Sequence, residues 1–327
     1  MLKDDITKIE KTRDKIKLSV NNISNDIKSK TGQSYNKLSL INSFLETADI
    51  SDGYAVGDVI KNGNFEKVYQ ESYTFTWEFT GHTGSVNSVA VDGQGNVYSG
   101  SSDSKVMKVS PEGRKIWEFT GHASSVRSVA VDGQGNVYSG SSDSKVMKIS
   151  PEGRKIWEFT GHTDSVMSVA VDKDGYVYSG SWDNKVMKIS SSGEKIWEFA
   201  GHTSTVKSVA VDSNGNVYSG STDNKVMKIS SSGEKIWEFT GHNGTVNSVA
   251  VDSEGNVYSG SKDSKVMKIS PEGQKIWGFT GHTGAVNSVA VDGQGNVYSG
   301  SDDKKVMKNE LKSELIGYKV LKVERGL

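Results

Sequence analysis

A forty-residue unit that occurs six times constrains the fold of this chain more than any other feature. The first copy runs from Gly81 to Thr120. The later copies follow without insertion or deletion and start at Gly121, Gly161, Gly201, Gly241 and Gly281. A fixed period of this length is typical of a supersecondary unit that cannot bury its own faces and must stack on its neighbours. The pattern inside one unit therefore decides most of the fold.

Each unit contains four short runs of β-type residues. In the first copy the runs start at Val86, Val97, Val106 and Ile116, and each one ends in a cluster of Gly, Asp, Ser or Pro. Alternating short runs separated by turn residues predict a four-stranded antiparallel meander. No window of the unit has apolar residues at helical spacing over a comparable length. Six such sheets predict an all-β fold, a six-bladed β-propeller with four-stranded blades.

The two ends of the repeat array predict how the ring closes. The sixth unit lacks the Trp-containing segment that ends every earlier unit, whereas Trp77–Thr80 precedes the first unit. We therefore predict that residues 73–80 add the outer strand of the last blade, beside the strand ending near Met307, and remove an open sheet edge. The tail offers an alternative, because Ile316 lies at the offset of the missing segment. The predicted propeller spans residues 73–308.

Residues 1–30 differ in kind from the repeats. Apolar residues recur there at alternating spacings of four and three, with Lys, Asp, Glu and Asn between them, which is a heptad pattern. The seam is mostly β-branched, which favours three or more strands, so we predict a coiled-coil stalk and a homotrimer. A single amphipathic helix docked on the propeller is the alternative. The predicted oligomerisation residues are Ile6, Ile9, Ile16, Val20, Ile23 and Ile27.

Three segments lie outside the stalk and the ring. Residues 31–50 have an apolar face that predicts a short helix. Residues 51–72 form a connector in which Asn62-Gly63 favours a tight turn. Residues 309–327 are a charged tail that either adds a strand to the last blade or runs along the stalk.

Composition excludes several classes of partner and site. The chain has 39 basic and 40 acidic residues and a net charge of -1, which offers no field to attract nucleic acid or an anionic membrane. It has no cysteine, and therefore no disulfide and no thiolate metal site. It opens without an apolar signal-type segment and contains no 18-residue apolar run, so we expect neither a cleaved secretion signal nor membrane insertion.

The search for catalytic chemistry yields no candidate. All six histidines belong to the Gly-His pair that opens each unit, and none has a second histidine at metal-ligand spacing. His82 and Asp103 resemble parts of a Ser-His-Asp triad, but six identical sets in one chain favour a structural role. Asp172–Gly175 resembles the start of a calcium loop without its terminal Glu. We therefore expect no enzyme activity, no metal and no cofactor.

The Gly-His pair, the Ser-Gly-Ser-x-Asp segment and the forty-residue spacing resemble the WD-repeat family over residues 69–308. The resemblance implies a buried hydrogen-bond network of His, Ser and Asp in each blade. The family's third-strand Trp is replaced by Val109 and its equivalents, and the Trp lies in the fourth strand, an arrangement similar to bacterial quinoprotein-type propellers. The network residues implied are His82, Ser99, Asp103, His122, Ser139, Asp143, His162, Ser179, Asp183, His202, Ser219, Asp223, His242, Ser259, Asp263, His282, Ser299 and Asp303.

Positions that differ between the copies are free to serve a surface, and two of them stand out. One lies five residues after the His, and the other directly precedes the turn Asp. In the WD-repeat family, matching positions lie on the face that commonly binds partners. An exposed Trp with Met and flanking basic residues is the composition of a binding hot spot; neutral variation at a permissive turn is the alternative. The predicted partner-binding residues are Trp182, Met167, Arg127, Lys207, Lys262, Asn87 and Asp302.

A second resemblance covers residues 23–45, where an Ile- and Lys-containing segment ends at Lys30-Thr31-Gly32 and an apolar segment follows. It resembles a motif of tail-fibre and tail-associated proteins of phages of Gram-positive bacteria. The resemblance implies a protein of the virion tail, made in the bacterial cytoplasm. Its N-terminus would attach to tail or baseplate proteins, and its propeller would bind a host cell-surface glycan or protein, with trimerisation adding avidity.

Two other functions compete with this interpretation. The first is a cytoplasmic WD-repeat scaffold that docks protein partners on the propeller face. The second is a lyase or quinoprotein-like enzyme with a site in the axial channel, which lacks any cluster of titratable residues that departs from the repeat.

Overall fold

A computed structural model describes residues 76–309, which contain 23 β-strands and no helix. No segment in this range is a helix of the length and apolarity that crossing a membrane requires. The coiled coil predicted over residues 1–30, the short helix over 31–50, the connector over 51–72 and the tail from 310 lie outside the described residues.

The strands form six antiparallel sheets in which sequence neighbours pair. Five sheets have four strands and the last has three. Their strands are β1 (Val86–Val91), β2 (Val97–Ser101), β3 (Val106–Val109) and β4 (Lys115–Phe119); β5 (Val126–Val131), β6 (Val137–Ser141), β7 (Val146–Ile149) and β8 (Lys155–Phe159); β9 (Val166–Val171), β10 (Val177–Ser181), β11 (Val186–Ile189) and β12 (Lys195–Phe199); β13 (Val206–Val211), β14 (Val217–Ser221), β15 (Val226–Ile229) and β16 (Lys235–Phe239); β17 (Val246–Val251), β18 (Val257–Ser261), β19 (Val266–Ile269) and β20 (Lys275–Phe279); and β21 (Val286–Val291), β22 (Val297–Ser301) and β23 (Val306–Asn309).

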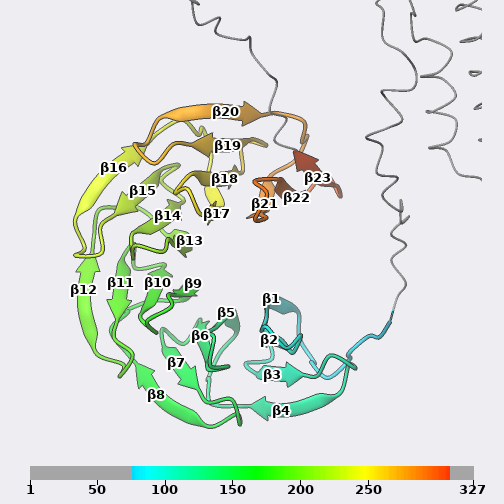
Figure 1. Cartoon of the computed structure of the whole chain (residues 1–327). Coiled ribbons are helices and arrows are strands. Elements are labelled where there is room, and N and C mark those ends of the chain that lie inside the picture. Colours follow the sequence, from blue (N-terminus) through cyan, green and yellow to red (C-terminus); the bar gives the residue numbers. More distant parts are fainter. Residues whose placement is uncertain (1–75, 310–327) are drawn as a thin grey trace, which may run out of the picture. The chain divides into compact units, whose positions relative to one another are not determined.

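Successive sheets pack on one another as propeller blades. The first strands β1, β5, β9, β13, β17 and β21 are neighbours in that order. Figure 1 shows these strands toward the centre of the arc and β4, β8, β12, β16 and β20 on its outside. Strand pairing also has the same register in every blade, as in Ser99 opposite Met107 and Ser139 opposite Met147. The predicted all-β fold of stacked, four-stranded blades is confirmed.

Turn residues fix where each strand ends. The Asp92 carboxylate accepts hydrogen bonds from the backbone N–H groups of Gln94 and Asn96, at 3.0 and 2.9 Å, and from the Tyr98 hydroxyl at 2.9 Å. Gly95 in this turn has φ of 82°, a conformation that costs a glycine little and other residues much. The Asp-x-x-Gly sequence therefore closes the hairpin between the first two strands of each blade.

The core lies between blades rather than within one of them. Tyr98, Val126, Val129 and Met147 come from adjacent sheets and are buried together. A methyl group placed on Gly100 would lie 2.6 Å from a Val126 methyl carbon of the next blade. Only a residue without a side chain permits this approach, which explains the invariant Ser-Gly-Ser of the second strand. Each blade therefore depends on its neighbour for its core, as the forty-residue period predicts.

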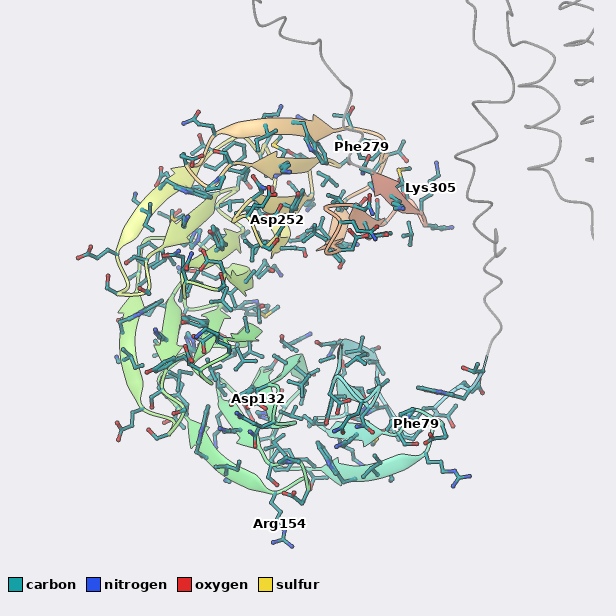
Figure 2. All side chains as sticks on the ribbon, viewed as in Figure 1. Phe79, Asp132, Arg154, Asp252, Phe279 and Lys305 are labelled. Carbon is teal, nitrogen blue, oxygen red and sulfur yellow. The ribbon has the colours of Figure 1, made fainter. Side chains whose placement is uncertain are left out.

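The strand predicted to close the ring is not formed in the structure. The last sheet ends at β23, and residues 76–80 form no strand. The Trp77 indole N–H nevertheless donates a hydrogen bond of 2.9 Å to the Pro111 carbonyl of the first blade. Trp117 makes the same bond to Pro151 one blade later. The segment is thus held by its contact with the first blade, and Figure 2 shows Phe79 and Lys305 at opposite ends of the arc.

The two end blades therefore expose surfaces that every internal blade buries. Val89 is 63% exposed in the first blade, whereas its equivalents are 6–7% exposed. Val306 of β23 is 80% exposed, and no atom lies within 4 Å of a methyl group placed on Gly300. Figure 1 shows the arc open between β1 and β21–β23.

Matched glycine substitutions test both the core and the open ends. Gly180→Ala would place a methyl group 2.6 Å from Val206, and we expect overpacking to lower the free energy of unfolding by about 1–3 kcal/mol. Gly300→Ala meets open space and should leave stability within about 0.5 kcal/mol of the parent protein. Urea denaturation measures both. Equal destabilisation by the two substitutions would mean that Gly300 packs against another blade, which would contradict the exposed surfaces described for the two end blades.

Candidate functional site

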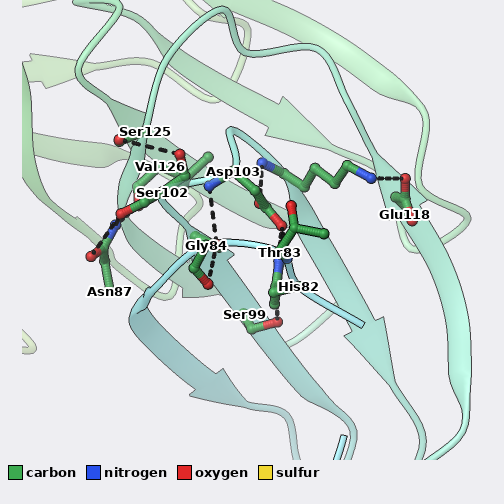
Figure 3. A network of polar contacts seen from close by, with 12 residues as sticks. His82, Thr83, Gly84, Asn87, Ser99, Ser102, Asp103, Glu118, Ser125 and Val126 are labelled. Carbon is green, nitrogen blue, oxygen red and sulfur yellow. Dashed lines mark hydrogen bonds and ion pairs between the residues drawn. The ribbon is translucent and has the colours of Figure 1, made fainter. Parts of the chain in front are cut away.

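Each blade contains one histidine held between a carboxylate and a serine. In the second blade, His122 Nδ1 lies 2.9 Å from Asp143 Oδ2, and Nε2 lies 2.7 Å from Ser139 Oγ. An ionised carboxylate only accepts hydrogen bonds, so Nδ1–H donates to Asp143, and Nε2 of the neutral ring accepts from the Ser139 hydroxyl. Figure 3 shows the equivalent set of His82, Ser99 and Asp103 in the first blade.

The structure brings all eighteen residues of the predicted network together, three in each blade. The Nδ1–Oδ2 distances are 2.8–3.0 Å and the Nε2–Oγ distances 2.7–2.8 Å. The distances match those of a catalytic triad, but Ser139 and Ser179 are 0% exposed. A serine hydroxyl that is buried inside a blade is not accessible to a substrate, so the hydrogen-bond network has a structural role.

The Asp of this network ties two loops together. Asp103 Oδ2 also accepts a hydrogen bond of 2.9 Å from the Thr83 backbone N–H, and Oδ1 accepts one of 3.0 Å from the Lys105 N–H. The segment that enters β1 is thereby fixed to the turn between β2 and β3. As a result, the variable residues Asn87 and Ser102, which lie in these two segments, have a set position.

The two variable positions contact one another directly in the first, second and sixth blades. Asn87 Nδ2 donates to Ser102 Oγ at 3.1 Å, and Arg127 Nε donates to Ser142 Oγ at 2.7 Å. Asn87 Nδ2 also reaches the Val126 carbonyl of the next blade at 2.9 Å. These contacts lie at the end of the strands where β2 turns into β3, and we call the variable positions of all the blades at this end the variable face.

Trp182 lies on the variable face of the third blade. Its side chain is 45% exposed, and its backbone N–H donates to the Ser165 carbonyl at 2.9 Å, as Ser102 donates to Ser85. Met167, half-buried, occupies the other variable position of the same blade. Arg127 and Lys207 are half-buried in the two flanking blades.

The remaining predicted residues lie in other blades of the variable face. Asn87 belongs to the first blade, Lys262 to the fifth and Asp302 to the sixth, where Asn287 Nδ2 donates to Asp302 Oδ1 at 2.5 Å. The structure thus gathers Trp182 and Met167 in one blade with Arg127 and Lys207 beside it, and separates the other three from them.

Sequence reasoning missed a cavity at the other end of the strands. It has a volume of about 490 Å³ and lies between the β9–β10 turn of the third blade and the β13–β14 turn of the fourth. Tyr176 lines it, at a position where the other five copies have Asn. This departure from the repeat is the signal that would have found the cavity.

The calcium-like segment is a closed hairpin turn. Asp172 Oδ1 accepts from the backbone N–H groups of Asp174 and Tyr176, and Oδ2 accepts from the Tyr178 hydroxyl. Among residues 76–309 there is no group of three His, Cys, Asp or Glu side chains that could hold a metal ion. The Asp172 oxygens are therefore engaged by the turn itself.

Comparison with known families agrees with this architecture. The sequence model of the family described as outer membrane protein assembly factor BamB matches residues 142–309, just over half of the chain. The chain belongs to this family. The model of the WD domain, G-beta repeat, matches residues 73–108 and 113–148. No curated protein matches the chain. Repeats of these two kinds mark a propeller that serves as a protein-interaction domain.

The histidine networks of this BamB-family propeller link its stability to pH. Burial raises the pKa of Asp143, but hydrogen bonds from the His122 ring and the Ala123 N–H outweigh burial and bring this pKa to about 2, from an ordinary 3.8. Burial lowers the pKa of His242, and hydrogen bonding to Asp263 opposes this shift only in part. Both groups bind protons more readily in the unfolded chain, so both stabilise the fold less as the pH falls.

We expect the free energy of unfolding to decrease below about pH 6.5, where His242 gains a proton in the unfolded chain, and most steeply from about pH 4 to about pH 2. Urea denaturation over a pH series measures the profile. Asp143→Asn should cost about 1–3 kcal/mol at neutral pH and flatten the acid limb, because it removes one titrating carboxylate. A profile that stays level down to pH 2 would contradict the role assigned to these networks.

Proposed function

We propose that the chain is a non-enzymatic binding protein that presents the variable face around Trp182 to a receptor. The exposure of Trp182 carries this proposal. The other five copies have Ser, Thr, Lys or Asp at the same turn, so the fold does not require an indole there. A half-exposed Trp offers a large apolar area and an N–H donor, the combination that dominates binding energy at interfaces.

The neighbours of Trp182 suit a contact surface. Met167 is an adaptable apolar side chain that conforms to a partner. Arg127 donates Nε–H to Ser142, which orders the guanidinium before a partner arrives. Lys207 has no hydrogen-bond or ion-pair partner among residues 76–309 and is available to an acidic or carbonyl group.

Binding rather than catalysis is supported by the burial of the only triad-like groups in the described range. The serine hydroxyls that face His122 and His162 lie in blade interiors, where no substrate reaches them. The proposed contact residues Trp182, Met167, Arg127 and Lys207 bind through apolar area and positive charge and form no acid-base pair with one another. The proposed binding function requires no cofactor and no metal.

At a finer level, we propose a component of a phage tail fibre or tail-like particle. Residues 1–30 would form a coiled-coil stalk that joins three chains and attaches to tail or baseplate proteins. The propeller would then bind a host cell-surface glycan or protein. The heptad pattern of residues 1–30 and the motif of residues 23–45 support this proposal, and three linked copies would strengthen weak contacts by avidity.

A cytoplasmic WD-repeat scaffold is the second candidate. The match of residues 73–108 and 113–148 to the WD domain favours it, because such propellers dock protein partners. Under this function the variable face would bind a peptide or protein inside the cell instead of a surface receptor, and residues 1–30 would serve only to oligomerise the scaffold.

Substituting Trp182 tests the receptor-binding surface. Trp182→Ser inserts the residue that the first two blades carry, so the melting temperature should stay within about 2 °C of the parent. We expect adsorption of fluorescently labelled protein to cell walls of Gram-positive bacteria to weaken at least about tenfold. Thr222→Ser, at the same turn of the fourth blade, is the matched control and should bind as the parent does. Unchanged adsorption of the Trp182 variant would show that the surface around Trp182 does not bind the receptor.

The oligomeric state tests the stalk. Light scattering on a sizing column should give the mass of three chains for the full protein and of one chain for a variant that lacks residues 1–30. Ile16→Asp, which places a charge in the predicted seam, should also give a monomer. A monomeric full-length protein would exclude the avidity mechanism. A variant that lacks residues 1–30 and is still a trimer would show that the chains associate through another segment and would contradict the predicted stalk.

A further inference from the structure

The cavity between the third and fourth blades is lined by residues that differ from those at the same positions of other blades. Tyr176 stands where the other copies have Asn. Ser231, in the β15–β16 turn, stands where the first, second and fifth copies have Pro. The volume of about 490 Å³ falls within the range of small-molecule sites. The cavity therefore coincides with departures from a sequence that is otherwise almost identical from blade to blade.

Tyr176 gives up a hydrogen bond that the repeat normally makes. In the second blade, Asn136 Nδ2 donates to Asp132 Oδ2 at 2.9 Å. Tyr176 makes no such bond; its half-buried ring lies 4.4 Å from Lys188 Nζ, measured to the ring centroid, and its hydroxyl has no hydrogen-bond partner among residues 76–309. The exchange replaces an internal contact by an aromatic ring and a polar tip that line a cavity.

Several other polar groups of the wall are also unengaged. Asn214 and Ser213 are exposed, and within the described residues neither side chain has a hydrogen-bond partner. The same holds for the Ser231 hydroxyl, although the Ser231 carbonyl accepts from Trp197 Nε1 at 3.0 Å. One amide and three hydroxyl groups, counting that of Tyr176, thus offer both donors and acceptors.

The charged groups of the wall, in contrast, already have partners within the protein. Asp212 accepts from the backbone N–H groups of Asn214 and Asn216 and from the Tyr218 hydroxyl, and Asp172 is closed by its own turn. Asp174 pairs with Lys173 at 3.0 Å. Lys188 Nζ lies over the rings of Tyr176 and Tyr178 and reaches the Ser231 carbonyl at 3.5 Å. Three carboxylates and two ammonium groups nearly cancel, so the cavity favours a neutral ligand.

We propose that this cavity binds a neutral sugar unit. A pyranose ring presents an apolar C–H face that packs on an aromatic ring, and hydroxyl groups around its edge that exchange hydrogen bonds with amides and hydroxyls. The side chains of Val171 and Val211 add apolar walls. The site lies at the opposite strand ends from Trp182 and does not rest on the function proposed for the variable face.

A ligand panel on the full-length protein tests the site. The probes are the methyl glycosides of glucose, galactose, mannose, N-acetylglucosamine, N-acetylgalactosamine and rhamnose, with arginine methyl ester as a cationic probe. We expect saturation-transfer NMR to detect at least one glycoside, with a Kd near the millimolar range typical of a single small contact. No glycoside signal, or binding of the arginine ester alone, would overturn the proposal.

Tyr176→Asn is the decisive variant, because it restores the residue of the other five blades. The introduced amide would regain the bond to Asp172 and the variant would lose the packing of the Tyr176 ring on the core around Tyr178, so the fold should be kept and the melting temperature should change by no more than about 4 °C. Sugar affinity should fall at least about tenfold. Trp182→Ser should leave it unchanged, which separates this site from the variable face. Equal sugar binding by the Tyr176 variant and the parent would show that the cavity is not the site.

Discussion

The close approach of each second-strand glycine to the first strand of the next blade underlies this structure. Gly100, Gly140, Gly180, Gly220 and Gly260 would each place a methyl group within 2.6–2.7 Å of a valine methyl carbon. No blade has a core of its own. This contact, together with the buried Tyr and Met beside it, therefore forms the hydrophobic core between blades that stabilises the array. An insertion within the first or second strand of a blade would separate a glycine from its valine, so these strands keep their length in every copy.

The histidine networks within each blade and the fourth-strand tryptophans between blades complete this scheme. The Asp of the network fixes the loop that enters a blade, and the indole N–H of Trp117 or Trp237 bonds to a carbonyl of the following blade. These contacts are satisfied inside the array, so buried polar groups here specify geometry rather than chemistry. A Ser-His-Asp arrangement is accordingly no evidence of catalysis when its serine is sealed within a sheet.

Much of this architecture is readable from the sequence, because two-residue alternation and turn residues are local signals. The strands, the Asp-x-x-Gly turns and the His–Ser–Asp sets all follow from residues within one unit. The end of the array does not, because Trp77 makes the bond to the following blade that Trp117 also makes, yet forms no strand beside β23. Pairing with β23 would join the two ends of the repeat array, and no pattern within one unit fixes such a contact. Tyr176 departs from the repeat, but the cavity that it lines forms only where the turns of two successive blades meet, at the other strand ends from Trp182.

The third blade shows where a repeat array can change without losing its fold. Blades on both sides cover its sheet faces, so a change within its strands would disturb two interfaces at once. Its departures lie where the strands begin and end instead, with Met167 and Trp182 at one set of strand ends and Lys173, Asp174 and Tyr176 at the other. Exposed turns tolerate such exchanges at little cost in stability. An internal blade is therefore the natural place for binding residues, since its neighbours hold both of its ends in a fixed position.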